Sequence, residues 1–446
     1  MLEHIIASHI MKHLDNSNIL SKEQHGFRKG HSCESQLINT IEEIARNIDQ
    51  GSQTDIIILD FEKAFDTVAH NRLMLKLEYY GIRGKLHGWI KNWLIGRTQI
   101  MVLDGARSNE ESVTSGVPQG TMLGPLMFLI YINNIAEGTS SPMKLFADDG
   151  LLFRRVNEAE DAKALQKDLN IVTSWAQVWQ MRFNPAKCYV LRITRKKKNI
   201  IETQYKMMGK CLQEVEHHPY LGIELDSKLN WDHQIDQCTA KAHKTLNFLR
   251  RNMYSCPSET KEMAYKSLVR PLLEYGASAW DPGLAGRISQ VEMVQRKAAR
   301  FVLGDWGQTS SVKGMLERLK WQSLQERRLV RRLSLLYQAH FQLFAITVPP
   351  YVNRSTRPST RKHPIQYLTI PTRTSVYADS FWPRTIQSWN NLSSATVLRK
   401  TTETFKEALI QDLQAGRLKV AETRSSKILS PAARHDLDNS STVFLF

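Results

Sequence analysis

The sequence contains few cysteines, no long apolar run and no excess of acidic residues. Its five cysteines form no Cys-x-x-Cys pair, which argues against a zinc knuckle and a disulfide framework and fits a reducing compartment. No apolar stretch approaches the roughly 20 residues that a membrane-spanning helix needs, and the first residues lack the charged-then-apolar pattern of a signal peptide. These absences predict an intracellular protein with no membrane partner, in either the nucleus or the cytoplasm.

Basic residues are present in clear excess. The chain of 446 residues has 60 Lys and Arg against 44 Asp and Glu, a formal net charge of +16. Between Arg287 and Arg332, eleven basic residues stand against four acidic ones, an excess that phosphate contacts explain better than a solvated helix face alone. The charge therefore favours a polyanionic partner, with nucleic acid as the first candidate. At 42% hydrophobic residues the chain can bury two or three domain cores.

Two stretches that carry carboxylates are the candidates for chemistry. Residues 144–153 place Asp148 and Asp149 between two apolar runs of strand length, which predicts a β-hairpin whose turn carries Asp-Gly. The aliphatic run 56–59 is typical of a buried strand and ends at Asp60. An aspartate in a turn is common, so the hairpin alone does not indicate a site. If the two strands are neighbours, Asp60 and Asp148 face each other and can hold divalent cations for phosphoryl transfer.

Two loops rich in glycine are candidates for ligand contacts. Residues 21–32 hold two glycines around Arg28 and Lys29, so this loop could approach a phosphate backbone, although a plain surface loop is equally consistent. Residues 115–125 are stiffened by repeated glycine and proline and open a helix. Their backbone N–H groups and Gln119 could contact a base pair or a sugar, whereas a simple helix-entry loop would not need so many glycines and prolines.

Hydrophobic periodicity predicts a first half that contains a sheet and a second half that is helical. Helices are expected over residues 2–15, 37–48, 66–80, 126–132, 165–179, 235–254, 259–275, 288–303 and 324–340, with helical patches at 378–392 and 404–413. Strands are expected over residues 56–59, 188–193, 205–208 and 220–225, and a strand pair around Gly105. The last residues, from Thr423 onward, are expected to be disordered.

Five short motifs follow one another in a recognisable order. They are Leu59-Asp60-Phe61, Gly116-Val117-Pro118-Gln119-Gly120, Phe146-Ala147-Asp148-Asp149, Asn184-Pro185-Ala186-Lys187 and Tyr220-Leu221-Gly222-Ile223. In this order and spacing the chain resembles the reverse transcriptase of non-long-terminal-repeat (LINE-type) retrotransposons, close to the jockey-like branch. The resemblance extends over residues 1–415 and includes two further motifs, His25-Gly26-Phe27-Arg28 and Phe381-Trp382-Pro383-Arg384-Thr385-Ile386.

The resemblance implies an α+β fold, the right-hand polymerase, in which a palm of antiparallel sheet and helices lies between fingers and a helical thumb. On this chain it implies partial fingers at 1–55, a palm at 56–227, a thumb at 228–345, a C-terminal extension at 346–422 and a disordered tail at 423–446. The implied activity is that of an RNA-directed DNA polymerase: two-metal nucleotidyl transfer from a deoxynucleoside triphosphate (dNTP) to a primer 3′-hydroxyl. The implied partners are an RNA template, a DNA primer and dNTP.

The resemblance also implies catalytic residues. Asp60 and Asp148 would bind both metal ions, Asp149 would support them, and the main-chain carbonyl of Phe61 would face a metal. Mg²⁺ is the implied ion, with Mn²⁺ as an alternative, because both accept oxygen ligands and neither needs His or Cys. Lys187 matches the position that protonates the leaving pyrophosphate, although a surface lysine at a strand start is equally consistent.

The remaining implied residues would bind nucleotide and primer. A ring at Phe65 would leave no room for a ribose 2′-hydroxyl and so select deoxynucleotides, with a core aromatic as the alternative. Gln119 and Gly120 would line the nucleotide or template pocket, and Arg28 would touch template or nucleotide. The segment Tyr220-Leu221-Gly222 would form the primer grip, which sets the primer hydroxyl against the catalytic carboxylates.

The chain departs from the family pattern in what it lacks. The sequence has no upstream fingers strand with an arginine that clamps the triphosphate. It also has no endonuclease domain, ribonuclease H domain or cysteine-rich knuckle. We therefore expect an N-terminally truncated copy. A catalytically inactive nucleic-acid-binding remnant without complete fingers is therefore the alternative. A third candidate is another palm-type phosphoryl transferase such as a nucleotide cyclase, against which the Gly-Val-Pro-Gln-Gly loop and the basic helical region argue. The sequence leaves the oligomeric state open.

Overall fold

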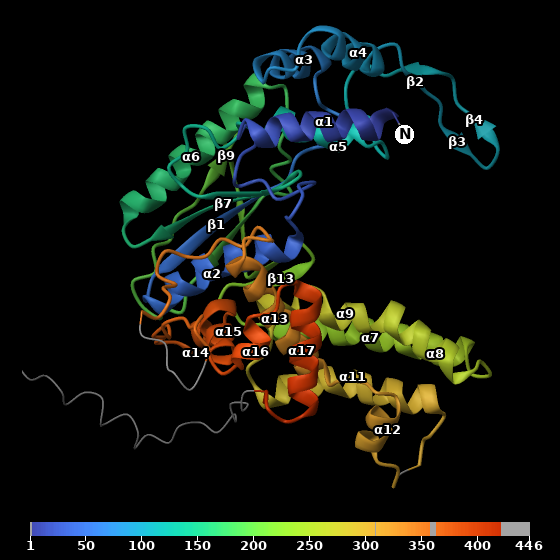
Figure 1. Ribbon diagram of the computed structural model, residues 1–446. Helices are drawn as coiled ribbons and strands as arrows, with labels where there is room; N and C mark the ends of the chain where they lie inside the picture. Colours follow the sequence, from blue (N-terminus) through green and yellow to red (C-terminus); the bar gives the residue numbers. More distant parts are fainter. Residues whose placement is uncertain (1, 308, 357–362, 421–446) are drawn as a thin grey trace, which may run out of the picture. The chain divides into compact units, whose positions relative to one another are not determined.

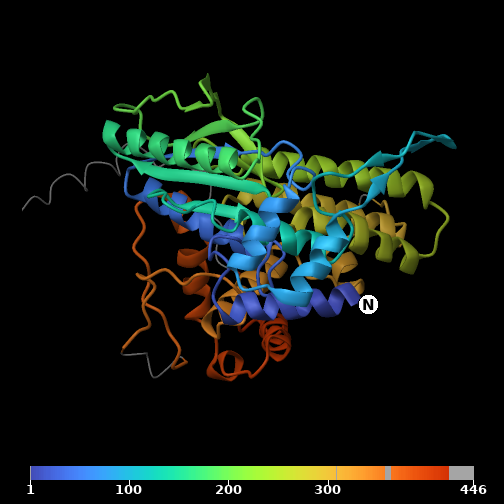
Figure 2. The same cartoon turned by 90° about the horizontal axis from the view of Figure 1, so that it is seen from above.

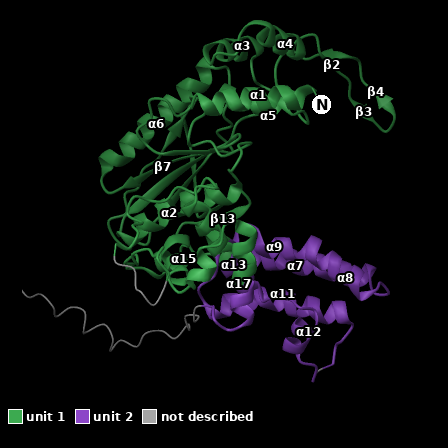
Figure 3. Ribbon diagram, in the orientation of Figure 1, with its two compact units in different colours: residues 1–234, 278–280, 331–409 green, residues 235–277, 281–330, 410–446 purple. Residues whose placement is uncertain are grey.

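The computed structural model describes residues 2–307, 309–356 and 363–420. They separate into two compact units (Figure 3). Unit 1 contains the described residues within 1–234, 278–280 and 331–409, and unit 2 contains those within 235–277, 281–330 and 410–446. The disordered tail expected at 423–446 lies outside the described residues.

A five-stranded sheet forms the centre of unit 1, with the order β11-β8-β1-β7-β6. Neighbouring strands are antiparallel, apart from the parallel pair β8–β11. The strands are β1 (Gln53–Leu59), β6 (Met143–Phe146), β7 (Asp149–Val156), β8 (Tyr189–Ile193) and β11 (Gln213–Val215). The α+β class with an antiparallel sheet therefore agrees with the expectation from the sequence.

Both faces of this sheet are covered by helices, which is why every residue of β1 is buried. Ile57 and Leu59 point into a core shared with α5 (Leu123–Ile132) and α6 (Ala159–Val178). Helix α2 (Cys33–Asp49) lies on the opposite face (Figures 1 and 2). The unbroken aliphatic run of β1 is thus the sequence signature of a central strand buried on two sides.

Shorter elements complete the first 234 residues of unit 1. They are α1 (Leu2–Asn16), α3 (His70–Tyr79), α4 (Gly84–Leu94), β2 (Thr98–Gln99), β3 (Val102–Leu103), β4 (Ala106–Arg107), β5 (Glu111–Ser112), β9 (Lys206–Met207), β10 (Lys210–Cys211), β12 (His217–Tyr220) and β13 (Ile223–Asp226). The strand expected over 220–225 is instead the hairpin β12–β13, which turns at Leu221 and Gly222 because both adopt positive φ.

The C-terminal part of unit 1 packs against α2. It comprises α14 (Ser375–Ala378), α15 (Phe381–Trp389), α16 (Ser394–Val397) and the start of α17 (Thr402–Gln414). The carboxylate of Glu42 on α2 accepts hydrogen bonds from the hydroxyls of Tyr351, Tyr377 and Ser380. Asp49, the last residue of α2, accepts hydrogen bonds from the backbone N–H and the hydroxyl of Thr374. Residues far apart in the sequence therefore share one core.

Unit 2 is helical throughout its described residues. Its helices are α8 (Ser258–Ala264), the π-helix η1 (Tyr265–Val269), α9 (Arg270–Glu274), α11 (Ala285–Leu303), α12 (Val312–Arg318) and most of α7 (Asp232–Asn252). Three further helices, α10 (Ala277–Trp280), α13 (Leu324–His340) and α17, are divided between the two units. The single helix expected over 259–275 is interrupted because Pro271 lacks the backbone N–H that would continue the α-helical ladder. No helix in the described chain has the length and apolarity to cross a membrane.

Candidate active site

The register of the central strands brings two of the predicted carboxylates together. In the β1–β7 ladder Leu59 pairs with Gly150, so the next residues, Asp60 and Asp149, are opposite one another. Directly opposed residues of antiparallel strands project to the same face. Asp148 precedes β7 in the turn that connects it to β6. The sequence pattern predicted that Asp60 would face Asp148. The charge of Asp148 acts on Asp60 from the adjoining turn, and the expected facing of the two side chains stays a prediction.

The turn consists of Ala147 and Asp148, because Phe146 already pairs with Asp149. The expected Asp-Gly turn is therefore wrong by two residues, and Gly150 lies within β7 opposite Leu59. Ala147 has φ of 53°, a left-handed conformation that costs energy for a residue with a side chain. Such strain persists only where surrounding contacts hold it.

Gln24 supplies those contacts. Its side-chain oxygen accepts hydrogen bonds from the backbone N–H of Ala147 (2.9 Å) and of Gly26 (2.8 Å), and its amide nitrogen donates to the Ala147 carbonyl (3.3 Å). On either side, Leu145 exchanges backbone hydrogen bonds with Glu23 and His25. The segment 23–26 is thus bound to the turn that carries Asp148.

This arrangement explains the first glycine of the 21–32 loop. A Cβ on Gly26 would lie 2.3 Å from the Ala147 nitrogen, so no side chain fits between the two segments. Arg28 points back into its own loop, donating to the Ser21 carbonyl at 2.7 Å and lying 3.8 Å from Asp15. The loop therefore supports the turn, and the expected contact of Arg28 with template or nucleotide stays a prediction.

Mutual repulsion is evident among the three carboxylates. Partial burial, followed by the charges of Asp148 and Asp60, raises the pKa of Asp149 to about 6. Burial also raises the pKa of Asp60; Asp148 adds to this effect, while the positive charge of Lys187 opposes it. Negative charge is therefore concentrated at this edge of the sheet, and a cation placed there would relieve it.

A cavity of about 480 Å³ opens beside these carboxylates and gathers several predicted residues. Its lining includes Asp60, Asp149, Lys187, Tyr220, Leu221 and Gly222. It also includes His218, whose pKa is lowered by burial, and which sequence reasoning missed. A histidine in a short exposed strand carries no local signal, so only its proximity to Asp60 could have indicated it.

The segment after Asp60 is held by the Asn184–Lys187 motif. The Asp60 carbonyl accepts from the Asn184 backbone N–H at 2.9 Å, and the thiol sulfur of Cys188 lies 3.4 Å from the Asp60 nitrogen. The ring of Phe61 stacks on that of Phe183 with centroids 4.3 Å apart. The motif that carries Lys187 is therefore part of the support for Asp60.

Phe65 and the 115–125 loop are also joined, outside that cavity. The Phe65 ring stacks on Phe128 of α5 (centroids 4.3 Å apart) and meets the half-exposed ring of Phe27 edge-on at 6.4 Å. Gln119 donates to the Asp66 carboxylate at 3.0 Å. A Cβ on Gly116 would lie 2.8 Å from the Asp66 Cα, which explains why this loop needs glycine.

Gly120, at the tip of the same loop, is exposed and has φ of 76°. A Cβ there would meet no atom within 4 Å, so local packing does not account for this glycine. Its expected contact with nucleotide or template stays a prediction.

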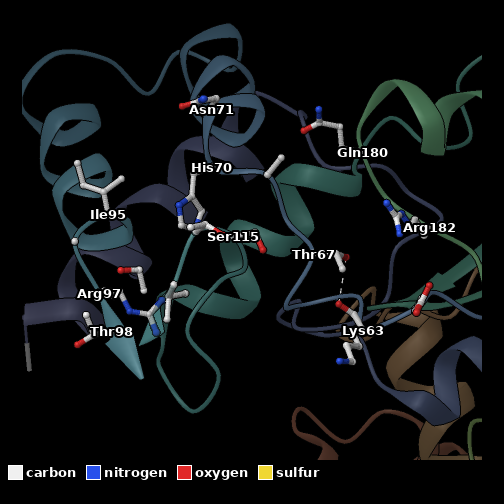
Figure 4. A pocket seen from close by; sticks show the side chains of 16 residues that line it. Lys63, Thr67, His70, Asn71, Ile95, Arg97, Thr98, Ser115, Gln180 and Arg182 are labelled. Atoms are coloured by element: carbon white, nitrogen blue, oxygen red, sulfur yellow. Dashed lines mark hydrogen bonds between the residues drawn. The ribbon is translucent and has the colours of Figure 1, made fainter. Parts of the chain in front are cut away.

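Basic side chains line a larger open cavity, of about 950 Å³, next to the same segment (Figure 4). Lys63 and Arg182 lie on one side of it and Arg97, which precedes β2, lies on the other. None of the three forms an ion pair with a carboxylate among the residues that the structure describes. Unneutralised cations beside a concentration of carboxylates suit a ligand that carries phosphates and arrives with a metal.

The chain matches known proteins over this region. The family model described as "Reverse transcriptase (RNA-dependent DNA polymerase)" matches residues 1–225, which include the sheet, the three carboxylates and Lys187. The chain belongs to the reverse transcriptase family.

The relatives of this chain are retrotransposon proteins. It is 27% identical over 316 residues to "Probable RNA-directed DNA polymerase from transposon X-element" of Drosophila melanogaster, covering 69% of this chain and 34% of the relative. It is 26% identical over 317 residues to "RNA-directed DNA polymerase from mobile element jockey" of Drosophila funebris, covering 68% and 34%. The chain spans about a third of the length of the curated relatives it matches.

Among solved structures, apo telomerase from Candida tropicalis matches 77% of this chain and 55% of that chain at 11% identity, with a TM-score of 0.39. This likeness is too distant to add to the description of the fold. The expected resemblance to the jockey-like branch is confirmed by the sequence relatives.

Proposed function

We propose that this chain is an RNA-directed DNA polymerase, which extends a primer 3′-hydroxyl with dNTP on an RNA template. The observation that carries the proposal is the strand register, in which Asp60 and Asp149 are opposed beside Asp148 at the mouth of a cavity. In this proposal the sheet of unit 1 is the palm, residues before it are partial fingers, and the basic helices of unit 2 are the thumb.

Divalent metal is the cofactor that the donor set suits. Asp60, Asp148 and Asp149 offer hard oxygen ligands whose mutual repulsion a cation would relieve. Among the described residues no three His, Cys, Asp or Glu side chains already converge as a metal cluster. Bound Mg²⁺ or Mn²⁺ would supply Lewis acidity toward the primer hydroxyl and the leaving phosphate.

The residues of the chain then have separate roles. Segment 220–222 would hold the primer end in the cavity that it shares with Asp60. A primer held in a fixed geometry lowers the entropic part of the activation barrier. Lys187, in the same lining, would give its proton to the leaving pyrophosphate. Phe65, supported by Phe128, would exclude a 2′-hydroxyl. Lys63, Arg97 and Arg182 would attract phosphates to the cavity beside Asp60.

Primer extension on an RNA template tests the proposal. We expect Asp148→Ala to lower the extension rate by on the order of three decades, because metal stabilisation of the developing charge is worth several kcal/mol. Glu407→Ala, which removes an exposed carboxylate from α17, is the matched control and should extend at the rate of the unaltered chain. Equal rates for Asp148→Ala and the control would refute the assignment.

The alternative function is a nucleic-acid-binding remnant that does not polymerise. The net charge of +16, which suits nucleic acid with or without catalysis, is the observation that favours it. Salt-dependent RNA binding with no extension at any Mg²⁺ or Mn²⁺ concentration would select this function. Any metal-dependent extension that Asp148→Ala abolishes would exclude it.

A further inference from the structure

A second groove lies beyond the 21–32 loop, on the C-terminal part of unit 1. It has a volume of about 870 Å³ and is formed by residues 29–31 on one side and by residues 339–354 with Tyr367 on the other. The two sides are joined by a hydrogen bond of 2.8 Å from the Ala345 N–H to the Gly30 carbonyl. We call it the C-terminal groove.

The charge of the C-terminal groove has one sign. Its lining contains Lys29 and Arg354, together with two histidines, and no carboxylate. Lys29 and Arg354 are exposed, and neither forms an ion pair with a carboxylate among the described residues. Unneutralised cations in a concave surface concentrate anions, so the groove suits a ligand that carries several negative charges.

Aromatic rings lie between these cations. His31, His340 and Phe344 line the groove and are partly exposed. Arg354 can only donate in its 3.2 Å contact with Nε2 of His340, so Nδ1 of His340 carries the proton and donates to the Tyr367 hydroxyl at 2.6 Å. The rings of His340 and Tyr367 are therefore held in place. A basic groove with ordered rings binds single-stranded nucleic acid, because phosphates meet the cations and bases stack on the rings.

Lys29 connects this groove to the candidate active site. It also lines a cavity of about 730 Å³ formed by α1, Phe27 and the Thr121–Met122 end of the 115–125 loop. Phe27 contacts Phe65, and the loop that carries Phe27 and Lys29 is fixed to the Asp148 turn through Gln24. Lys29 therefore lines both cavities, and its loop is the one fixed to the catalytic turn.

We propose that the C-terminal groove binds the single-stranded part of the RNA template as it approaches the active site, an inference that rests on the proposed polymerase function. An acidic peptide is the alternative ligand. It would neutralise the cations of the groove, but it has no bases to stack on the rings and need not extend to the Phe27 cavity. The C-terminal segment, which packs on α2, thereby acts as a template guide.

Binding of primed templates without nucleotide substrate tests the guide. The probes are labelled primer–RNA duplexes whose template strand ends either in a single unpaired nucleotide or in about ten, and the readout is fluorescence anisotropy with the full chain. We expect the longer overhang to bind more tightly. Arg354→Ala should weaken the longer probe about fivefold at physiological salt, the effect of one phosphate contact, and should leave the shorter probe unchanged.

Lys400→Ala is the matched control, because Lys400 is an exposed cation of unit 1 outside the groove lining. It should bind both probes as the unaltered chain does, and Arg354→Lys should restore most of the affinity. The proposal would be overturned if Arg354→Ala weakened the binding of both probes equally. It would also be overturned if Lys400→Ala weakened the longer probe as much as Arg354→Ala does, or if neither variant changed the affinity. So would competition by polyglutamate that is as effective as competition by unlabelled RNA.

A crosslinking measurement covers the case in which Arg354→Ala misfolds. Photoactivatable 4-thiouridine in the overhang should crosslink the unaltered chain within residues 29–31 or 339–354, and crosslinks confined to other residues would contradict the guide. Neither measurement needs catalysis. If primer extension failed, the proposed polymerase activity would be refuted. The binding of RNA in the C-terminal groove would still be decided by these two measurements alone.

Discussion

At the scale of single residues, the catalytic turn depends on an unusual conformation of Ala147. Its positive φ directs the chain so that Asp148 occupies the turn while Asp149 enters β7. Gln24 stabilises this conformation through two hydrogen bonds to Ala147 and accepts a third from the Gly26 N–H, and Gly26 provides the space for this contact. A buried glutamine whose side chain bonds both the N–H and the carbonyl of Ala147 acts as a positioning residue for the carboxylates.

Phe65 is the residue whose predicted role is most directly testable. We expect Phe65→Ala to lower the preference for deoxynucleotides over ribonucleotides about tenfold to a hundredfold, because the ring that would exclude the 2′-hydroxyl is removed. Steady-state incorporation of each nucleotide opposite the same template base gives the ratio of kcat/KM. Phe65→Tyr keeps the ring and its stacking on Phe128 and should keep the preference. Unchanged discrimination in Phe65→Ala would assign the ring to the core only.

At the scale of elements, α2 joins the sheet to the C-terminal segment. One of its faces covers β1 and β6, while Glu42 receives hydroxyls from Tyr351, Tyr377 and Ser380. The guanidinium of Arg46 lies 3.7 Å above the Tyr351 ring. A carboxylate buried among neutral donors is costly to ionise, and burial raises the pKa of Glu42 to about 7 although the hydroxyls oppose the shift.

This shift predicts how stability depends on pH. The pKa of Glu42 in the folded chain is above its ordinary value of 4.5, so the folded state binds the proton more tightly than the unfolded chain does. The contribution is fully present below pH 4.5 and is lost as the pH rises through 7. It amounts to on the order of 3 kcal/mol for a group this buried. Glu42→Gln, which cannot ionise, should flatten this part of the profile.

Urea denaturation at a series of pH values between 4 and 8 measures the free energy of unfolding of the unaltered chain and of Glu42→Gln. Glu407→Gln, which neutralises an exposed carboxylate, is the control and should follow the unaltered profile. Parallel profiles for the unaltered chain and Glu42→Gln would show that Glu42 does not titrate in this range.

At the scale of the whole molecule, the net charge of +16 sets the relation to polyanions. Several cations of unit 1, among them Lys63, Arg97 and Arg182, are left without carboxylate partners in the described chain. In unit 2, by contrast, Arg327 and Arg328 are committed to Glu274 and Asp281 within the unit. Part of the basic excess between Arg287 and Arg332 is therefore structural and unavailable to phosphates.

The remaining charge should make RNA binding strongly dependent on salt. If three phosphates are neutralised, the affinity for a single-stranded RNA falls about twentyfold between roughly 0.05 and 0.2 M salt, because condensed counterions are released. Anisotropy titrations over that range give the slope. An oligomer of the same sequence with an uncharged methylphosphonate backbone should show almost no slope. An equal slope for both oligomers would mean that binding is not carried by phosphate contacts.

The sequence alone determined the parts of this protein that follow from local patterns. The sequence predicted the strand that ends at Asp60 and the amphipathic helices, because burial on both faces and helical periodicity are properties of consecutive residues. The order of the five motifs could be read directly. The family followed from the same motifs, and the match over residues 1–225 confirms it.

Only the tertiary structure decided what those residues contact. It extended the β1–β7 ladder to Leu59 and Gly150, placed the turn at Ala147 and Asp148, and inserted a π-helical segment before Pro271. The bond from Gln24 to Ala147 joins positions 123 residues apart, and Tyr377 reaches Glu42 across 335. No local pattern encodes such pairings, because strand register and packing are selected by the fold as a whole.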